Sequence, residues 1–181
     1  MRRKRSLKSV ILLNIVACIV SCQSNHAEKM KEVIGQTLTS FPELIQITPE
    51  TIHPNVFPGL LVESGAAVVF FFQKDECQTC IMEKVPDWAD RISESISGVP
   101  IVFIFPTSAG KDLITLAKLT PNAYVMLDKE NLFAKSNKFI PKESFLRVWL
   151  VDNNGKIILC GNPADNPKLA DLYRREIDKR R

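Results

Sequence analysis

Seven consecutive apolar residues occupy positions 66–72, where the sequence reads Ala-Ala-Val-Val-Phe-Phe-Phe. A run of this length, rich in β-branched and aromatic side chains, predicts a strand that is buried on both faces. Four polar residues follow, and Cys77 and Cys80 then stand at the start of a segment with helical spacing. The pattern therefore predicts a buried strand that passes through a short loop into a helix with a Cys-x-x-Cys motif at its N-terminus.

The pattern after this motif alternates between helical and strand spacing. Apolar residues recur every three or four positions from Ile81 to Ser97, and Pro86 within this segment predicts a kink. Residues 99–105 predict a second buried strand. The remaining predicted elements are a helix at 110–119, a strand at 123–128, strands at 146–151 and 156–160 joined by an Asn-Gly turn, and a helix that begins at Pro163.

The order of these elements predicts the fold class. Residues 41–62 contain four prolines, and we expect only short edge strands there. Strands that then alternate with helices predict a parallel sheet covered on both faces, to which the closing hairpin adds antiparallel strands. We therefore expect an α/β domain at 41–181, a three-layer sandwich with a central mixed sheet and helices on both faces.

The N-terminus has the pattern of an export signal. A basic start precedes an apolar run at residues 10–20, which is too short to span a bilayer of about 30 Å. The sequence Ile-Val-Ser-Cys at 19–22 resembles a bacterial lipobox, which implies that residues 1–21 are a lipoprotein signal peptide and that Cys22 is the lipidated residue. Residues 22–40 would then be a tether with a short helix; the alternative is an uncleaved signal anchor.

The positive charge of the chain belongs to its N-terminus. The formal net charge is +4, but five of the 24 basic residues precede residue 22 and no acidic residue does. The rest of the chain has 19 basic residues against 20 acidic ones, a net charge of −1. We therefore expect no nucleic-acid partner.

The Cys-x-x-Cys motif is the main candidate for chemistry. A helix N-terminus favours the thiolate, so Cys77 is the candidate nucleophile, and Cys80 lies one helical turn away, where it could resolve a mixed disulfide. A structural disulfide is one alternative. A zinc site is another, but it needs about four ligands, and His26 and His53 both lie outside the strand–helix unit. We expect no metal and no cofactor.

With these motifs, residues 60–178 resemble the thioredoxin-like fold, and in particular the membrane-tethered TlpA-type thiol-disulfide oxidoreductases and their redoxin relatives. The resemblance is strongest in the Phe-rich strand that leads into Cys77 and Cys80, and in the stretch at 149–158. It implies an enzyme, a reductase rather than an oxidase, that exchanges disulfides with envelope proteins and is re-reduced by a membrane electron donor. The implied location is the periplasmic side of a bacterial envelope, with the chain held to the membrane by its lipid anchor.

Three positions depart from the family pattern. Counting back from Asp152 places Arg147 where the family has a cis-proline that faces the cysteines, so Arg147 is a candidate for the substrate groove. Phe71 stands where many members bury a carboxylate, and Glu76 stands where they have tryptophan. Arg147 would favour the Cys77 thiolate and Glu76 would oppose it. These departures keep open a second function, a thioredoxin-like binding module in which the Cys77–Cys80 disulfide is structural or vestigial.

We expect the third cysteine of the domain and its two tryptophans to be packing residues. Cys160 ends a predicted strand and is expected to be buried. Trp88 and Trp149 lie on apolar faces and are expected in the core.

Overall fold

The computed structural model describes residues 26–39, 44–50, 52–53, 56–106, 109 and 112–180. Residues 26–33 are helical, and Val33–Arg181 form one compact unit. The predicted signal peptide and Cys22 lie outside the described residues. The strands are β1 (Leu44–Ile47), β2 (Ile52–His53), β3 (Ala66–Phe71), β4 (Ile101–Pro106), β5 (Tyr124–Asp128), β6 (Val148–Asp152) and β7 (Ile157–Cys160). The α-helices are α2 (Phe57–Ser64), α3 (Gln78–Ser95), α4 (Asp112–Leu119), α5 (Leu132–Ser136) and α6 (Pro167–Asp178), with short 3-10 helices at Lys129–Asn131 (η2), Ser144–Leu146 (η3) and Pro163–Asp165 (η4).

The described strands form one mixed sheet in the order β2-β1-β5-β4-β3-β6-β7. The β3–β4 and β4–β5 pairs are parallel, and all the other pairs are antiparallel. Every residue of β3 and of β4 is buried, because both strands lie in the middle of the sheet with helices on both sides. This arrangement confirms the predicted α/β sandwich with a mixed central sheet.

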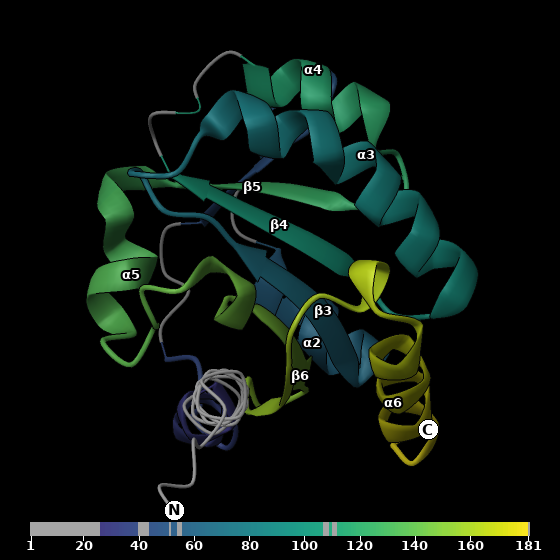
Figure 1. Ribbon diagram of the computed structural model, residues 1–181. Helices are drawn as coiled ribbons and strands as arrows, with labels where there is room; N and C mark the ends of the chain where they lie inside the picture. Colours follow the sequence, from purple (N-terminus) through teal and green to yellow (C-terminus); the bar gives the residue numbers. More distant parts are fainter. Residues whose placement is uncertain are drawn as a thin grey trace, which may run out of the picture. The chain divides into compact units, whose positions relative to one another are not determined.

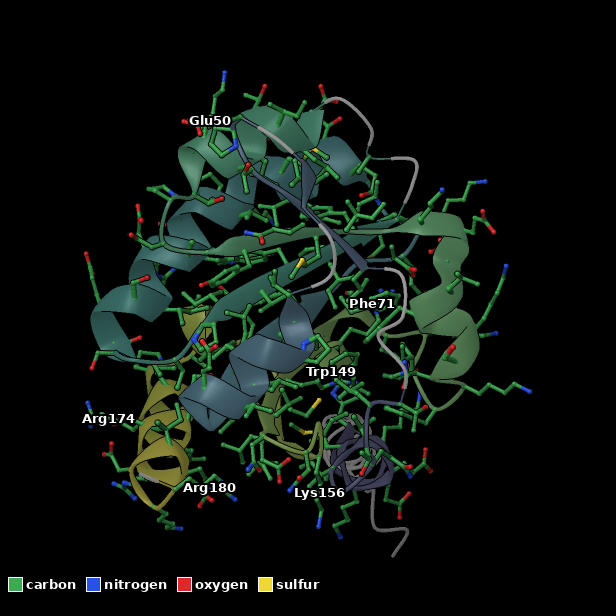
Figure 2. All side chains as sticks on the ribbon, turned by 180° about the vertical axis from the view of Figure 1, so that it is seen from behind. Glu50, Phe71, Trp149, Lys156, Arg174 and Arg180 are labelled. Carbon is green, nitrogen blue, oxygen red and sulfur yellow. A yellow bond between two sulfur atoms is a disulfide. The ribbon has the colours of Figure 1, made fainter. Side chains whose placement is uncertain are left out.

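Alternate residues of β3 face the two helical layers. Val68 and Phe70 belong to the larger core cluster, which includes buried residues of α3, α4 and α6. Phe71 packs on the other side, where its ring lies 5.2 Å from that of Phe133 in α5 and 6.4 Å from that of Trp149. The views from the two sides show α3 in front of the sheet (Figure 1) and α2 with the labelled Phe71 and Trp149 on the reverse (Figure 2).

The prediction for residues 41–62 was only partly right. Short strands β1 and β2 do form there, but α2 was not expected. Pro58 lies in the first turn of α2, where a proline without an N–H loses no helical hydrogen bond, and Gly65 ends the helix with a φ of 73°. The prolines of this segment were therefore compatible with a helix as well as with turns.

The start of the last helix differs from the prediction. This helix begins at Pro167, while Pro163 begins the 3-10 helix η4. The segment that contains Pro86 forms one helix from Gln78 to Ser95, and the kink at Pro86 stays a prediction. The loss of one backbone donor is therefore tolerated within a helix whose inner face is buried at Val85, Ala89 and Ile92.

Part of the segment that the sequence assigned to a tether contacts the domain. Gly35 N donates to Ile157 O at 2.8 Å, and Leu38 N donates to Gly155 O at 2.9 Å. Ile157 N donates in turn to Gln36 O at 2.8 Å, and Leu38 is 3% exposed. Residues 35–38 therefore cover the edge of the sheet at the β6–β7 hairpin.

Candidate functional site

Cys77 and Cys80 form a disulfide at the N-terminus of α3, and both residues are exposed. Cys77 is the N-cap residue of the helix, and its Sγ accepts a hydrogen bond from Cys80 N at 3.4 Å. The Cα atoms of the two cysteines are 5.4 Å apart. The sequence motif therefore has the location that was expected, beyond the end of β3 and at the start of a helix.

The loop between β3 and α3 is held by its own polar groups. Glu76 N donates to Gln73 O at 3.2 Å, and the Glu76 carboxylate accepts a hydrogen bond from Gln73 N at 2.7 Å. The Gln78 side chain donates to Gln73 O at 2.8 Å. These contacts close a tight turn immediately before Cys77, so the position of the first cysteine is set by the loop as well as by the helix.

Arg147 reaches this loop from the other side of the site. Its backbone lies between η3 and β6, and its carbonyl accepts a hydrogen bond from Phe71 N at 3.0 Å. Its side chain is only 2% exposed, and its Nη2 lies 2.9 Å from Glu76 Oε1. Arg147 and Glu76, which the sequence analysis placed in opposition, are therefore partners in one ion pair.

This pairing bears on the expected role of Arg147. Burial lowers the pKa of its guanidinium from the usual value, and the carboxylates of Glu76, Asp75 and Glu143 oppose that shift. Its Nε and Nη1 have no hydrogen-bond partner among the described residues. The guanidinium is therefore buried and paired with Glu76, and Arg147 lines the same cavity as the two cysteines, so its role as a substrate-groove residue stays a prediction.

Phe71 occupies the position at which many family members have a carboxylate. Its side chain is 4% exposed and is enclosed by the rings of Phe133 and Trp149. No proton acceptor is therefore supplied from this position, and the carboxylate that lines the site next to Cys77 is that of Glu76.

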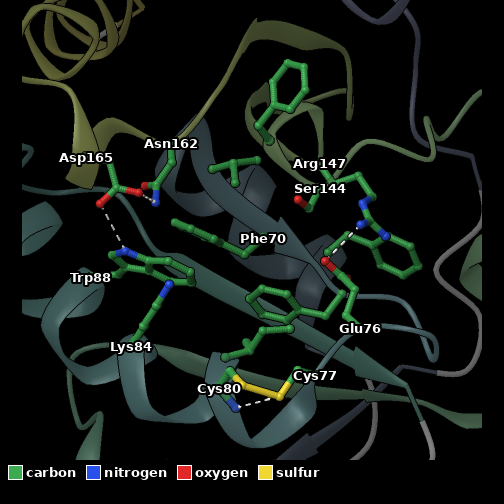
Figure 3. Close-up of a pocket in the computed structure, with 15 residues that line it drawn as sticks. Phe70, Glu76, Cys77, Cys80, Lys84, Trp88, Ser144, Arg147, Asn162 and Asp165 are labelled. Atoms are coloured by element: carbon green, nitrogen blue, oxygen red, sulfur yellow. Dashed lines mark hydrogen bonds and ion pairs between the residues drawn. A yellow bond between two sulfur atoms is a disulfide. The ribbon is translucent and has the colours of Figure 1, made fainter.

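A cavity of about 410 Å³ borders the disulfide. Figure 3 shows Cys77 and Cys80 at one end, Glu76 and Arg147 along one side, and Lys84 and Trp88 along α3. Trp88 was expected in the core, but it is half-buried and lines this cavity. Its Nε1 donates to Asp165 Oδ1 at 3.3 Å, and its ring stacks on Phe70 at 5.6 Å.

Sequence reasoning did not find several residues that line the cavity. Lys84 and Trp88 stand four and eight positions after Cys80, so helical periodicity could have placed them on the same face as the motif. Phe145, Asn162 and Asp165 come from distant segments, and only the fold brings them to the cavity.

The buried residues Cys160 and Trp149 have the packing roles that were predicted. Cys160 is 1% exposed and Trp149 is fully buried. The Leu146 carbonyl accepts hydrogen bonds from both, at 3.2 Å from Cys160 Sγ and 2.7 Å from Trp149 Nε1. Burial raises the pKa of the Cys160 thiol to about 12.

Two features are absent from the part of the chain that the structure describes. Within these ranges, no group of three or more His, Cys, Asp or Glu side chains is arranged to hold a metal ion. In the same ranges, no helix combines the length and the apolar character needed to cross a membrane.

Solved structures with similar folds have redox proteins among them. A structure described as a putative thiol:disulfide interchange protein DsbE from Chlorobium tepidum matches 80% of this chain and 96% of its own, with a TM-score of 0.53 and 13% identity. A cysteine-to-serine mutant of PrxQ from Xylella fastidiosa matches 81% of this chain and 95% of its own, with a TM-score of 0.52 and 12% identity. A thioredoxin-like protein from Bacteroides caccae has a TM-score of 0.52 and 13% identity over 83% of this chain, which spans about half (52%) of that longer protein.

No protein-family model matches the sequence, and no curated protein matches it at significant similarity. The likeness to solved structures, at 12–13% identity, concerns the fold alone. It agrees with the mixed sheet and its strand order. The chain therefore adopts a thioredoxin-like fold.

Proposed function

We propose that this protein is a thiol-disulfide oxidoreductase that acts on protein disulfides through Cys77 and Cys80. The observation that supports this function best is the exposed disulfide that begins α3 and borders a cavity. Disulfides that serve only stability are usually protected, whereas exposed ones are more often labile or catalytic. The fold comparisons agree with redox chemistry of this class.

The proposed reaction begins with the reduced dithiol. The Cys77 thiolate attacks a client disulfide, so that a mixed disulfide forms and one client thiolate leaves. Cys80 then attacks the Cys77 sulfur, which releases the second client thiolate and regenerates the Cys77–Cys80 disulfide. The client gains two electrons, and a membrane electron donor must return two electrons to the protein before the next cycle. The direction of this cycle, reduction of the client, rests on the resemblance to TlpA-type proteins.

Replacement of the resolving cysteine tests this function. In Cys80→Ser, the mixed disulfide with a client cannot be resolved, so we expect covalent complexes in non-reducing gels of an envelope lysate, and these should disappear with reductant. The double variant Cys77→Ser/Cys80→Ser is the matched control and should form none. Absence of complexes in Cys80→Ser would contradict the proposed enzyme.

A binding module is the second candidate, and Phe71 is the observation that favours it. With a buried ring where related enzymes place a carboxylate, the site lacks a proton acceptor at that position. The reduction potential of Cys77–Cys80 separates the two functions, because a structural disulfide is expected below about −300 mV and a catalytic one above that value. Equilibration with glutathione of known redox ratio measures it.

We also propose that the domain is anchored to a bacterial membrane through Cys22 and faces the periplasm. This proposal rests on the lipobox-like sequence at 19–22 and on the apolar run before it. Labelling with radioactive palmitate should succeed in the unchanged chain and fail in Cys22→Ala. Continued labelling of Cys22→Ala would show that Cys22 is not the lipidated residue.

A further inference from the structure

One face of α3 forms a wall of the cavity beside the disulfide. Cys80, Lys84 and Trp88 are spaced four residues apart and therefore lie along the same side of the helix. At 1.5 Å of rise per residue, Lys84 lies about 6 Å and Trp88 about 12 Å from Cys80 along the axis. Figure 3 shows the Lys84 side chain beside Trp88 on this wall, with the disulfide at the other end of the helix face.

The rest of the cavity is mainly aromatic and aliphatic. Phe145 lines it from η3, and this side chain is 42% exposed. Phe70 also lines the cavity and stacks on Trp88. A volume of about 410 Å³ with such walls lies in the range of sites that bind small ligands or a few side chains.

The charges of the cavity are almost all neutralised within the protein. Arg147 pairs with Glu76 at 2.9 Å, and Asp165 lies 3.9 Å from Arg91 and accepts a hydrogen bond from Asn162 at 2.8 Å. Lys84 is exposed, and among the described residues that line the cavity it alone is a charged side chain with no charged partner. The α3 wall of the cavity therefore presents one positive charge that no described acidic side chain compensates, next to the apolar part of the cavity.

We propose that this cavity selects an extended client segment with a particular spacing of side chains. In such a client, an acidic residue lies two positions from the reacting cysteine, and an apolar residue lies three or four positions from it. The client sulfur bonds to Cys77, whose sulfur is joined to that of Cys80 in the disulfide, so client positions are counted from Cys80. An extended chain advances about 3.3 Å per residue, so about 6 Å to Lys84 corresponds to two residues and about 12 Å to Trp88 to between three and four. The acidic side chain would pair with Lys84 and the apolar one would pack on Trp88 and Phe145. The inference rests on the oxidoreductase function proposed above and adds the class of client.

The test uses alanine-rich peptides with one cysteine in a mixed disulfide with 2-nitro-5-thiobenzoate. The Cys77 thiolate of the reduced protein bonds to the peptide sulfur and the coloured thiobenzoate anion leaves, so the second-order rate of exchange is read directly. Peptides carry Glu, Gln or Lys two positions before or after the cysteine. We expect the best Glu peptide to react about fivefold faster than its Lys counterpart at low salt, and the difference to shrink in 1 M salt, where the screening length falls to about 3 Å.

Substitutions in the protein test whether the preference for Glu peptides over Lys peptides arises in the cavity. Lys84→Glu should reverse the order of the Glu and Lys peptides. Lys118→Glu makes the same charge change at an exposed residue of α4 that does not line the cavity, and it should keep the original order. Trp88→Ala should slow exchange with peptides that carry Leu three or four positions from the cysteine more than exchange with their Ala counterparts.

The reaction of the reduced protein with glutathione disulfide shows whether the oxidoreductase function holds, independently of the proposed client class. If glutathione disulfide and every peptide fail to react with the reduced protein, the oxidoreductase function is wrong. If all the peptides react at equal rates, or if Lys84→Glu and Lys118→Glu change the rates alike, the function stands and the proposed client class is wrong. The proposed client class is supported if Glu on one side of the cysteine speeds exchange and if this preference reverses in Lys84→Glu but not in Lys118→Glu.

Discussion

At the scale of single residues, the ion pair of Arg147 with Glu76 lines the same cavity as Cys77. The disulfide itself is uncharged, but reduction followed by loss of a proton places a negative charge on Cys77 within the same cavity. Arg147 is buried and lines this cavity, and its Nε and Nη1 have no hydrogen-bond partner among the described residues. Glu76 partly cancels the effect of Arg147, so the two residues should act on the thiol in opposite directions.

Arg147→Met should therefore raise the pKa of the Cys77 thiol by about one unit or more, because it removes the cation and leaves the Glu76 carboxylate unpaired. Glu76→Gln should lower the pKa of this thiol, and the double variant should fall between the two. The pH dependence of alkylation by iodoacetamide in a Cys80→Ser background measures the values. Equal pKa values in all these proteins would show that the ion pair serves only the structure of the loop.

Cys160 is an internal control for that measurement. With a pKa of about 12 it is almost entirely protonated at pH 8, where about one thiol in ten thousand would be ionised. Its thiol is also buried against the Leu146 carbonyl. In a Cys80→Ser chain of residues 33–181, which contains neither Cys18 nor Cys22, alkylation of the folded protein should therefore be confined to Cys77.

The residue scale also marks a limit of sequence reasoning. The position of the Cys-x-x-Cys motif could be predicted, because it depends on a buried strand and a helix that are adjacent in the sequence. The Glu76–Arg147 pair could not, because the two residues are 71 positions apart and local patterns carry no information about such contacts. Trp88 was assigned to the core for a related reason. An apolar stripe on a helix shows which face packs against the domain, but not which of its residues lie at the border of a cavity.

At the scale of elements, helix α6 depends on its N-terminal cap. The Asn166 side chain accepts hydrogen bonds from Lys168 N at 3.1 Å and from Leu169 N at 3.3 Å. The helix buries Ala170, Tyr173 and Ile177 against the domain, so a weakened first turn should affect the stability of the whole fold.

Asn166→Ala should lower the free energy of unfolding by about 1 kcal/mol, because two backbone donors lose their acceptor. For a domain of this size that loss corresponds to a fall of about 2–4 °C in the melting temperature. Asn166→Asp keeps an acceptor and should remain within a few tenths of a kcal/mol of the unchanged protein. Urea unfolding of the three proteins provides the comparison, and an equal loss in both variants would contradict the capping role.

The elements that were predicted best are those whose burial is uniform. β3 and β4 were recognised because a strand covered on both faces is apolar throughout. α2 was missed because Pro58 and Gly59 are common both in turns and at helix starts, and the sequence alone does not decide between them. α5 was also missed, since it has only five residues and a single buried side chain, Phe133.

At the scale of the whole domain, residues 33–39 contribute to the fold. Val33 and Leu38 are each 3% exposed, and residues 35–38 exchange backbone hydrogen bonds with the β6–β7 hairpin. Thr39 N also donates to Asn137 Oδ1 at 2.7 Å. Each buried apolar side chain of this size contributes about 1.5–3 kcal/mol.

A chain of residues 40–181 should therefore be less stable than a chain of residues 33–181, by about 3–6 kcal/mol. Denaturant unfolding of the two purified chains measures the difference. Similar stabilities would show that residues 33–39 are held at the sheet edge without contributing to folding.

The register of the sheet places residues 33–39 far from the Cys77–Cys80 disulfide. Ala66 pairs with Asp152 and Phe70 with Val148, so the β6–β7 turn lies beyond the Ala66 end of β3 while the disulfide lies beyond the Phe71 end. The length of β3 separates the two ends by about 17 Å. An anchor upstream of Val33, such as the one proposed at Cys22, would hold the domain by the end remote from Cys77. The disulfide end of the sheet would then be free of the chain segment that leads to the anchor.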